Sequence, residues 1–471
     1  MRKMVKSVSI VIIAAALFVF ASSLVVCADQ GVSGTAGAAV APAAAAAATI
    51  PIDSGDTAWL LFSSALVLIM TPALGFFYGG MVRKKNVLAT IMQSFWAICI
   101  ISIVWVLWAY SMAFGPSIHG LIGDLSWFGL NGVGQGSSPI GSPKVPHLAF
   151  MAFQMMFAII TPALITGAFA ERMKFSAYTI FIVLWATLVY APIAHWVWNP
   201  AGWLSKLGAL DFAGGTVVHI NAGIAALVAA IVVGKRKGYL EVPIMPNNIG
   251  YTVLGASLLW FGWFGFNAGS AITSGGLASL AFVTTNTATA AAALGWAFTE
   301  WAHKGRPTVL GAASGAVAGL VAITPAAGFV TPMGAIAIGV IAGMICYGAV
   351  NLRPKLGYDD SLDVVGVHGL GGLWGAIATG IFAVHLIASD GDPKSSGFYH
   401  QGLLYGDFHQ FLVQVFSVLV SVCYAVVMTF ILGTIVNKTI GLRVDAEEET
   451  LGLDQSQHGE SGYEMFESGL D

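Results

Sequence analysis

Residues 211–223 read Asp211-Phe-Ala-Gly-Gly-Thr-Val-Val-His219-Ile-Asn-Ala-Gly223, and residues 363–372 read Asp363-Val-Val-Gly-Val-His368-Gly-Leu-Gly-Gly372. Each stretch is apolar and rich in glycine, begins with an aspartate and carries one histidine. Both lie inside apolar runs long enough to cross a bilayer, where an ionisable side chain is costly and usually functional. The two stretches therefore predict a membrane-embedded site built on two related helices.

The composition around these stretches is that of a membrane protein. Of 471 residues, 57% are hydrophobic and 9% are charged, whereas soluble domains carry about 25% charged residues. The formal net charge is −3, and no basic cluster interleaved with aromatic residues occurs, so the sequence indicates no nucleic-acid partner. We predict an all-α polytopic membrane protein that sits in the lipid bilayer.

Apolar runs divide the chain into predicted transmembrane helices. Each run is near the twenty residues that a bilayer requires, and several are rich in Gly and Ala, which permit close packing between helices. Eleven runs are expected to span, at about 57–80, 87–114, 147–170, 175–195, 215–234, 249–270, 276–302, 308–325, 331–351, 361–387 and 408–437.

The positions of Lys and Arg predict the orientation of these helices. Of the 20 Lys and Arg residues, three lie in residues 1–28, which leaves 17 to place. Only Lys144, Lys206 and Lys394 fall on one side. By the positive-inside rule, we predict an inner (plasma) membrane protein with its mature N-terminus outside and its C-terminus in the cytoplasm. The cytoplasmic side would carry Arg83, Lys84, Lys85, Arg172, Lys174, Lys235, Arg236, Lys237, Lys304, Arg306, Arg353, Lys355, Lys438 and Arg443.

Eleven spans can be divided as five, five and one, which is how an inverted repeat would look. The fifth span would enter from outside with His219, and the tenth would enter from inside with His368. The first and sixth spans resemble each other more weakly, through Gly75-Phe-Phe-Tyr-Gly79 and Gly262-Trp-Phe-Gly-Phe266. We therefore predict a five-plus-five inverted repeat whose two histidine helices run antiparallel.

Residues 1–28 are predicted to be a secretory signal peptide. A short basic segment precedes the apolar run from Val8 to Val26, and Val26-Cys27-Ala28 supplies a cleavage site. The run is also long enough to cross a bilayer, so an uncleaved first span is the alternative. The Ala-rich stretch 29–56 is predicted to be an exported linker.

The sequence carries no recognisable enzyme motif. Neither an HExxH metal motif nor a GxSxG nucleophile motif occurs. Cys99, Cys346 and Cys423 lie in apolar runs, without the spacing of metal ligands or of a disulfide framework, and are predicted to be packing residues. We therefore predict no catalytic residues, no metal site and no cofactor.

The two intramembrane histidines have three possible interpretations. Antiparallel symmetry could bring His219 and His368 together, so that a neutral pair shares one proton and offers hydrogen-bonding edges to a small polar molecule. Alternatively, each is a structural histidine bonded between helices. A third possibility is a membrane redox enzyme in which they ligate haem or copper.

Two aromatic residues and one serine in the outer half of the bundle could together attract a cation. Phe157, Trp198 and Ser270 all fall there by topology, and aromatic faces attract a cation while a hydroxyl can accept a hydrogen bond from it. An interfacial aromatic belt is the alternative. Asp211, at the start of its helix, is expected to be an N-cap that also favours an entering cation.

Four segments carry a family resemblance. They read Gly167-Ala-Phe-Ala-Glu-Arg172, Asp211-Phe-Ala-Gly-Gly-Thr-Val-Val-His-Ile-Asn221, Gly262-Trp-Phe-Gly-Phe-Asn-Ala-Gly-Ser270 and Gly366-Val-His-Gly369. Together they closely resemble the ammonium transporter family of bacteria and archaea, which is related to the Rhesus proteins. The resemblance runs from about Thr57 through the tail. It implies a transporter domain over 57–437 and a homotrimer with a pore through each subunit.

The resemblance also implies roles for individual residues. Phe157, Trp198 and Ser270 match the family's external ammonium site, with Asp211 as the acidic residue near it. Phe157 and Phe266 match its stacked phenyl gate. The remaining matches are Trp263, a residue lining the pore, and the twin histidines His219 and His368.

The function implied is transport of ammonium, with methylammonium as an analogue. The cation would be recruited at the outer site, lose its proton, pass the gate and the histidines as ammonia, and be reprotonated inside. Whether the proton crosses as well is left open. The resemblance further implies that residues 438–471 form a cytoplasmic regulatory tail and that a PII-type protein binds the cytoplasmic face. An ammonium sensor that signals through this tail is the alternative.

Overall fold

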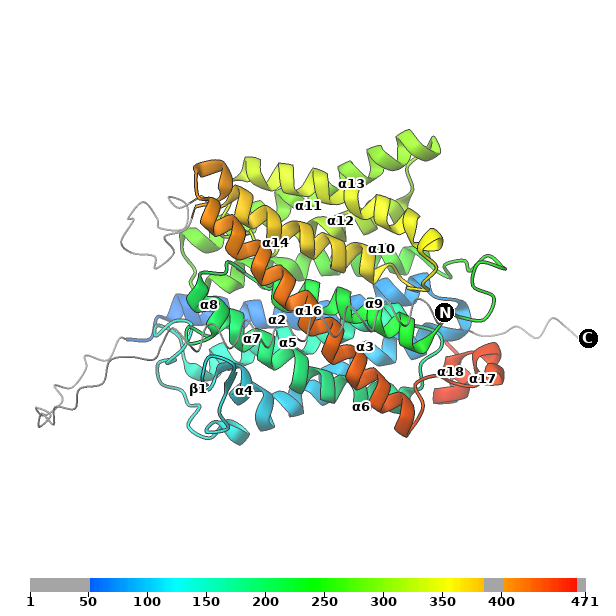
Figure 1. Cartoon of the computed structure of the whole chain (residues 1–471), viewed down its shortest axis with the longest axis horizontal. Helices are drawn as coiled ribbons and strands as arrows, with labels where there is room; N and C mark the ends of the chain where they lie inside the picture. The colour runs from blue at the N-terminus through cyan, green and yellow to red at the C-terminus, as the bar shows by residue number, and fades with distance from the viewer. Residues whose placement is uncertain (1–50, 385–400, 464–471) are drawn as a thin grey trace, which may run out of the picture.

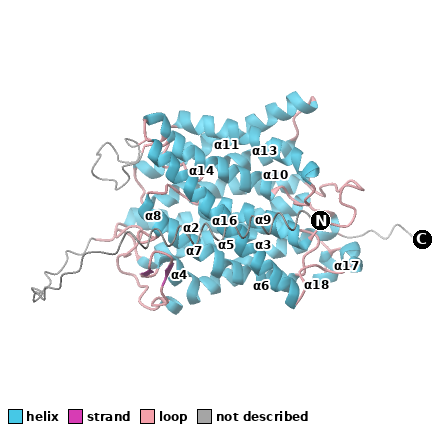
Figure 2. Cartoon of the chain, viewed as in Figure 1, coloured by secondary structure: helices cyan, strands magenta, loops and turns pink. Residues whose placement is uncertain are grey.

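The computed structural model describes residues 51–384 and 401–463. The predicted signal peptide and all but the last six residues of the predicted linker lie outside the described residues. The described helices lie side by side along the long axis of the molecule, and α16 crosses them obliquely (Figure 1). Helix dominates the described residues, and the one small antiparallel sheet among them is formed by β1 and β2 (Figure 2).

Within the described residues, ten helical segments are long and apolar enough to cross a membrane, and α12 is a shorter apolar helix. This supports the predicted eleven spans, of which the eighth is short. The tenth begins four residues later than predicted and ends at Phe382. The spans are α2 (Ser54–Met81), α3 (Val87–Val104) with η2 (Trp105–Ala109) and α4 (Tyr110–Phe114), α5 (His147–Phe169), α6 (Phe175–Trp185) with η4 (Ala186–Tyr190) and α7 (Ala191–Trp198), η5 (Gly215–Ile220) with α9 (Asn221–Val233), α10 (Ile249–Trp263) with η6 (Phe264–Ala268), α11 (Gly276–Lys304), α12 (Val309–Ile323), α13 (Pro332–Leu356), η8 (Val365–Leu370) with α14 (Gly371–Phe382), and α16 (Phe408–Thr439).

The remaining elements are short and lie at the two ends of the bundle. They are η1 (Lys84–Asn86), β1 (Ser117–Ile118), β2 (Ile122–Gly123), η3 (Phe128–Leu130), α8 (Trp203–Leu207), η7 (Gly269–Ala271), η9 (Leu403–Tyr405), α17 (Ala446–Leu451) and α18 (Leu453–His458).

The inverted repeat is visible in how the two histidine helices begin. Asp211 lies eight residues before His219, and Asp360 lies eight residues before His368. The aspartate that corresponds to Asp211 is therefore Asp360, and the sequence-based pairing of Asp211 with Asp363 was wrong by three residues. The error arose because Asp363 is the aspartate nearest to the apolar run.

Hydrogen bonds support this corrected register. Asp211 Oδ2 accepts from the backbone N–H of Thr216, five residues on, at 2.8 Å. Asp360 Oδ2 accepts from the N–H of Val365, also five residues on, at 2.7 Å. The first N–H groups of a helix have no partner within the helix, and a preceding carboxylate supplies one. Both halves of the repeat therefore begin their histidine helix with the same cap.

The backbone turns in the same way after each cap. The third residue after the aspartate has a left-handed backbone, at Gly214 (φ 112°) and at Asp363 (φ 62°). Glycine adopts this conformation without strain, whereas an aspartate there needs support from its surroundings. Asp363 has such support, because its carboxylate pairs with Arg353.

Each histidine lies in a π-helical turn. His219 lies in η5 and His368 in η8, and both turns continue directly into regular helix. Single π-helical turns inside α-helices are rare and occur frequently at functional sites. The two helices also approach very closely, because Gly223 of α9 packs against the backbone of Gly369. Glycine is required at Gly223, since any side chain there would meet that backbone.

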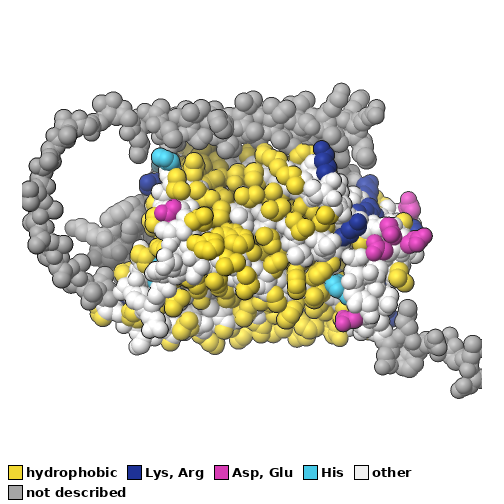
Figure 3. All heavy atoms as spheres, turned by 90° about the horizontal axis from the view of Figure 1, so that it is seen from below, with side chains coloured by type: hydrophobic (Ala, Val, Ile, Leu, Met, Phe, Trp, Pro, Cys, Tyr) yellow, Lys and Arg dark blue, Asp and Glu magenta, His cyan; other side chains and the backbone are white. Residues whose placement is uncertain are grey.

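Charged side chains gather at one end of the bundle, beyond an apolar belt (Figure 3). Glu171 is 1% exposed and lies at the centre of this end. Its Oε1 accepts from Arg83 Nε at 3.1 Å and from Asn86 Nδ2 at 3.0 Å, and its Oε2 accepts from Arg236 at 2.9 Å. Burial raises the pKa of Glu171, but Arg236 and Arg83 outweigh it and hold the pKa below the ordinary value. The loops between spans are thus tied together through one carboxylate.

Glu171→Gln is expected to destabilise the protein by about 2 kcal/mol, because it removes the charge that faces Arg83 and Arg236. Folding lowers the pKa of Glu171 below its unfolded-state value of about 4.3. The stability that the ionised carboxylate contributes is therefore fully present above a pH of about 4.3 and is lost as pH falls through the folded-state pKa. Thermal unfolding of the purified protein across this pH range measures both effects. The exposed Glu241→Gln is the matched control, and an equal loss in both variants would contradict this role.

The tail that follows α16 is folded onto the same end. Asp454 Oδ1 accepts from the N–H of Ala89 at 2.8 Å, and Glu449 Oε1 accepts from the N–H of Lys237 at 2.6 Å. Glu449 also pairs with Arg443 at 2.6 Å. The predicted tail thus contains two short helices, α17 and α18, docked on the start of α3 and on the loop at Lys237.

Candidate functional site

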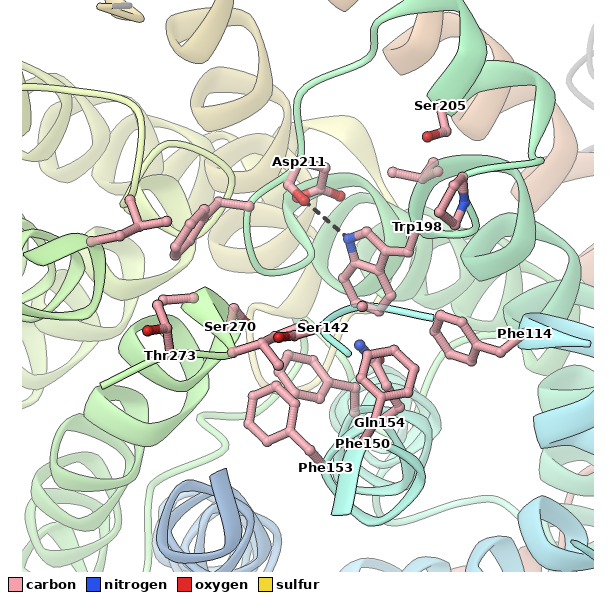
Figure 4. A pocket seen from close by; sticks show the side chains of 18 of the residues that line it. Phe114, Ser142, Phe150, Phe153, Gln154, Trp198, Ser205, Asp211, Ser270 and Thr273 are labelled. Atoms are coloured by element: carbon pink, nitrogen blue, oxygen red, sulfur yellow. Dashed lines mark hydrogen bonds between the residues drawn. The ribbon is translucent and has the colours of Figure 1, made fainter. Parts of the chain in front are cut away.

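A cavity of about 670 Å³ opens at the end of the bundle opposite the charged cluster. We call it the vestibule. Aromatic and polar side chains surround it, and Figure 4 shows them converging from several helices. The four residues that the sequence assigned to an external site all line it, namely Phe157, Trp198, Ser270 and Asp211.

Two rings and one hydroxyl of the vestibule lining come from the predicted external site. The ring centroids of Phe157 and Trp198 are 5.6 Å apart with planes at 86°, an edge-to-face contact. Ser270 is half-buried and donates its hydroxyl hydrogen to the Phe266 carbonyl at 2.8 Å. Because that hydrogen is engaged, the lone pairs of the Ser270 oxygen are left to accept a hydrogen bond. The vestibule therefore combines π faces with one fixed acceptor.

Asp211 holds the start of its helix in place. Its Oδ1 accepts from the N–H groups of Gly214 and Gly215 at 2.8 and 2.6 Å, and its Oδ2 from Thr216 at 2.8 Å. Its backbone carbonyl accepts from Trp198 Nε1 at 3.0 Å (Figure 4). The carboxylate is thus occupied by backbone donors, and the residue acts as a helix cap that also positions the indole.

Two phenyl rings close the vestibule on its inner side. The centroids of Phe157 and Phe266 are 4.3 Å apart, and the two side chains are 1% and 0% exposed. No hydrated ion passes between rings in contact, because their edges leave no room for water. The predicted gate residues therefore lie together, in a closed arrangement.

The two histidines meet just beyond these rings. Nδ1 of His219 lies 3.3 Å from Nδ1 of His368, and the ring planes are inclined by 23°. Only one proton fits between these nitrogens, so a neutral pair shares it as donor and acceptor. Within residues 51–384 and 401–463, no cluster of three His, Cys, Asp or Glu could hold a metal.

A narrow apolar chamber surrounds the histidine pair. It has about 10 Å³ of free volume, enough for one water-sized molecule. Trp263 lies along it, stacked on His219 at 5.3 Å and fixed by a bond from its Nε1 to Thr324 Oγ1 at 2.9 Å. His219 Nε2 has no hydrogen-bond partner among the described residues. It is a polar atom available to a small molecule in the chamber.

Sequence reasoning missed two residues near this path. Asp360 was passed over, although the eight-residue spacing before each histidine could have identified it. Gln154 was not among the predicted site residues, yet it lines the vestibule. Cys99, Cys346 and Cys423, the three cysteines in the described part of the chain, form no disulfide; Cys346 is buried, as a packing residue would be, whereas Cys99 is exposed.

These features define a class of membrane protein. A vestibule leads to a pair of closed phenyl rings and then to a narrow chamber with two histidines, inside a bundle with an inverted repeat. This is the construction of a channel or transporter for a small solute that sheds its water before it crosses.

The comparison with known proteins specifies the class. The chain matches the model of the Ammonium Transporter Family over residues 58–463 and belongs to that family. It is 53% identical over 411 residues to an ammonium transporter of Bacillus subtilis, and the alignment covers 87% of this chain and 98% of that protein. It is 48% identical over 412 residues to the ammonium transporter Amt1 of Archaeoglobus fulgidus, and the alignment covers 88% of this chain and 100% of that protein.

Solved structures show the same fold. The crystal structure of Mep2 from Saccharomyces cerevisiae superimposes with a TM-score of 0.80 at 38% identity, covering 89% of this chain and 94% of that chain. A structure described as a sensor Amt protein superimposes with a TM-score of 0.77 at 30% identity, covering 86% of this chain and 98% of that chain.

Proposed function

We propose that this protein transports ammonium across a membrane through a pore within each subunit. The observation that carries the proposal is the order of the elements along one path: vestibule, phenyl rings, histidine chamber. Ammonium is recruited in the vestibule by Phe157, Trp198 and Ser270, while Asp211 contributes its negative charge from the helix start. The cation loses its proton before the rings, and ammonia continues past His219 and His368.

Deprotonation is favoured by the cost of taking a charge into the chamber. A naked cation in an apolar pore loses its hydration, which costs several kcal/mol or more even after relaxation of the protein. Ammonia is neutral and avoids this penalty. Its N–H groups and lone pair can bond to the free edges of the histidine pair. Potassium has a similar size but no proton to lose, so it is rejected at the same point.

Trp198→Leu is expected to weaken recruitment of ammonium by a few-fold to about tenfold, which corresponds to a lost cation–π attraction of about 0.5–1.4 kcal/mol. The measurement is the ammonium concentration that halves uptake of radiolabelled methylammonium into proteoliposomes. Trp198 is half-buried at the vestibule wall, so the variant should fold. An unchanged half-inhibitory concentration would assign Trp198 to an interfacial belt.

The membrane arrangement follows from the same proposal. We infer a homotrimer in the inner (plasma) membrane, with the vestibule outside and the charged end in the cytoplasm, after cleavage of residues 1–28. The clustering of Lys and Arg at the end opposite the vestibule supports this orientation. The exposed apolar side chains along the spans are available to lipid and to neighbouring subunits.

The docked tail supports a regulatory role for the cytoplasmic end. Deleting the chain after Asn437 is expected to abolish binding of a PII-type regulator, because it removes α17 and α18 and uncovers the loops beneath them. Pull-down of a PII-type protein by the full and truncated chains measures this. Equal binding by the two chains would place the interface on the loops between spans instead.

A sensing role is the second candidate, favoured by the structural similarity to a protein described as a sensor. The two functions separate experimentally. A sensor would bind ammonium without net uptake, whereas a transporter accumulates labelled substrate in proteoliposomes that contain no other protein.

A further inference from the structure

Gln154 has an unused hydrogen-bond acceptor in the wall of the vestibule. The side chain is 7% exposed, and its amide oxygen has no hydrogen-bond partner among the described residues. A buried acceptor without a partner is unfavourable, and most such groups in folded proteins are paired. The position therefore requires an explanation beyond packing.

The helix places Gln154 beside the residues that face the substrate. It lies three residues before Phe157 on α5, and residues three apart share a helix face. Both residues line the vestibule together with Trp198 and Ser270. Figure 4 shows Gln154 among the rings that surround this cavity. Its amide oxygen is buried as it stands. Because the terminal amide torsion is broad and roughly two-fold, rotation about it brings the oxygen to the cavity.

The substrate needs more acceptors than the predicted site offers. Ammonium carries four N–H donors, and the Ser270 oxygen accepts one of them. The faces of Phe157 and Trp198 attract the charge but accept no conventional hydrogen bond. The carboxylate of Asp211 is already occupied by backbone N–H groups. A second oxygen acceptor would satisfy another of these donors, and Gln154 carries one.

We infer that Gln154 is a substrate-contacting residue of the vestibule, whose amide oxygen accepts a hydrogen bond from the ammonium ion. The inference rests on the proposed transport of ammonium. It explains why a buried polar residue lies among the three rings that α5 contributes to the lining, Phe150, Phe153 and Phe157. It also adds an acceptor that holds the cation upstream of the phenyl gate.

Two substitutions test this contact in opposite directions. Gln154→Leu keeps the size of the side chain and removes the acceptor, so the half-inhibitory ammonium concentration should rise about tenfold, which corresponds to about 1.4 kcal/mol. Gln154→Glu replaces the amide with a carboxyl group, which attracts a cation more strongly once it is ionised. The half-inhibitory ammonium concentration of this variant should therefore fall as pH rises through the pKa of the new carboxyl group. A purely structural role would move both variants in the same direction.

Gln93→Leu is the matched control. Gln93 on α3 is also buried, and its amide oxygen also lacks a partner among the described residues, but it does not line the vestibule. It should leave the half-inhibitory concentration unchanged.

If Gln154→Leu fails to fold, Gln154→Glu carries the test alone. If the parent protein takes up labelled methylammonium and both Gln154 variants keep the parent half-inhibitory ammonium concentration, the contact is wrong. The proposed function is then unaffected. A parent without uptake overturns both.

Discussion

Gly223→Ala is expected to reduce transport by roughly tenfold or more, although the substitution adds a single methyl group. A Cβ at this position would lie 2.2 Å from the backbone nitrogen of Gly369 and 2.3 Å from its Cα. These are backbone atoms, so the methyl group can be accommodated only if the helices separate. Gly369 follows His368, and His219 lies one turn before Gly223. The separation therefore acts directly on the 3.3 Å contact between the histidines.

Gly433→Ala is the control for the general cost of adding a methyl group to a buried helical glycine. Its Cβ would meet only Val232 Cγ1 at 3.7 Å, an ordinary contact. This variant should assemble and transport like the parent. Methylammonium uptake at equal protein content in the two variants makes the comparison. Parent-like uptake by Gly223→Ala would show that the close approach of the two helices is not needed for the histidine site.

Replacement of either histidine by aspartate is expected to change what crosses the pore. His219→Asp or His368→Asp places a fixed acceptor, and a negative charge when ionised, in a chamber otherwise lined by Trp263 and apolar side chains. That charge lowers the cost of admitting an intact cation. Ammonium should then pass without losing its proton, and potassium, which the parent rejects, should pass as well. Potassium flux into proteoliposomes is the readout.

The histidine variants also separate the two selectivity elements. His368→Ala interrupts the pair without adding a charge and should not admit potassium. If the aspartate variants fold, carry ammonium at the parent rate and still exclude potassium, then proton loss is not the filter. Selectivity would in that case lie in the vestibule, at Phe157, Trp198 and Ser270.

Much of the fold could be predicted because membrane spans leave strong local signals. Hydropathy and length identified the eleven spans, including the short α12, and the charge distribution predicted which loops share an end. The antiparallel histidine helices could be predicted because Asp, Gly and His recur at similar spacing. The contact between His219 and His368 follows from that symmetry and needed no knowledge of other side chains.

Features that depend on long-range hydrogen bonds could not be predicted in this way. The bond from Ala89 to Asp454 joins residues 365 apart, so nothing local to the tail indicated that it would dock. The π-helical turns at the histidines depend on how neighbouring helices pack, not on the sequence of the turn itself. Asp360 was missed because Asp363 lies closer to the apolar run, and the bond from Val365 to Asp360 shows which of the two aspartates is the cap.

Transport by the unmodified protein in proteoliposomes, with ammonium, methylammonium and potassium measured in parallel, tests the central claim most directly. We expect saturable movement of ammonium and methylammonium, and no potassium flux even at high concentration. Recording the current at the same time distinguishes an ammonia channel, which carries none, from an electrogenic transporter. Potassium movement at a rate close to that of ammonium would contradict the account, because an ion without a proton cannot pass a filter that works by deprotonation.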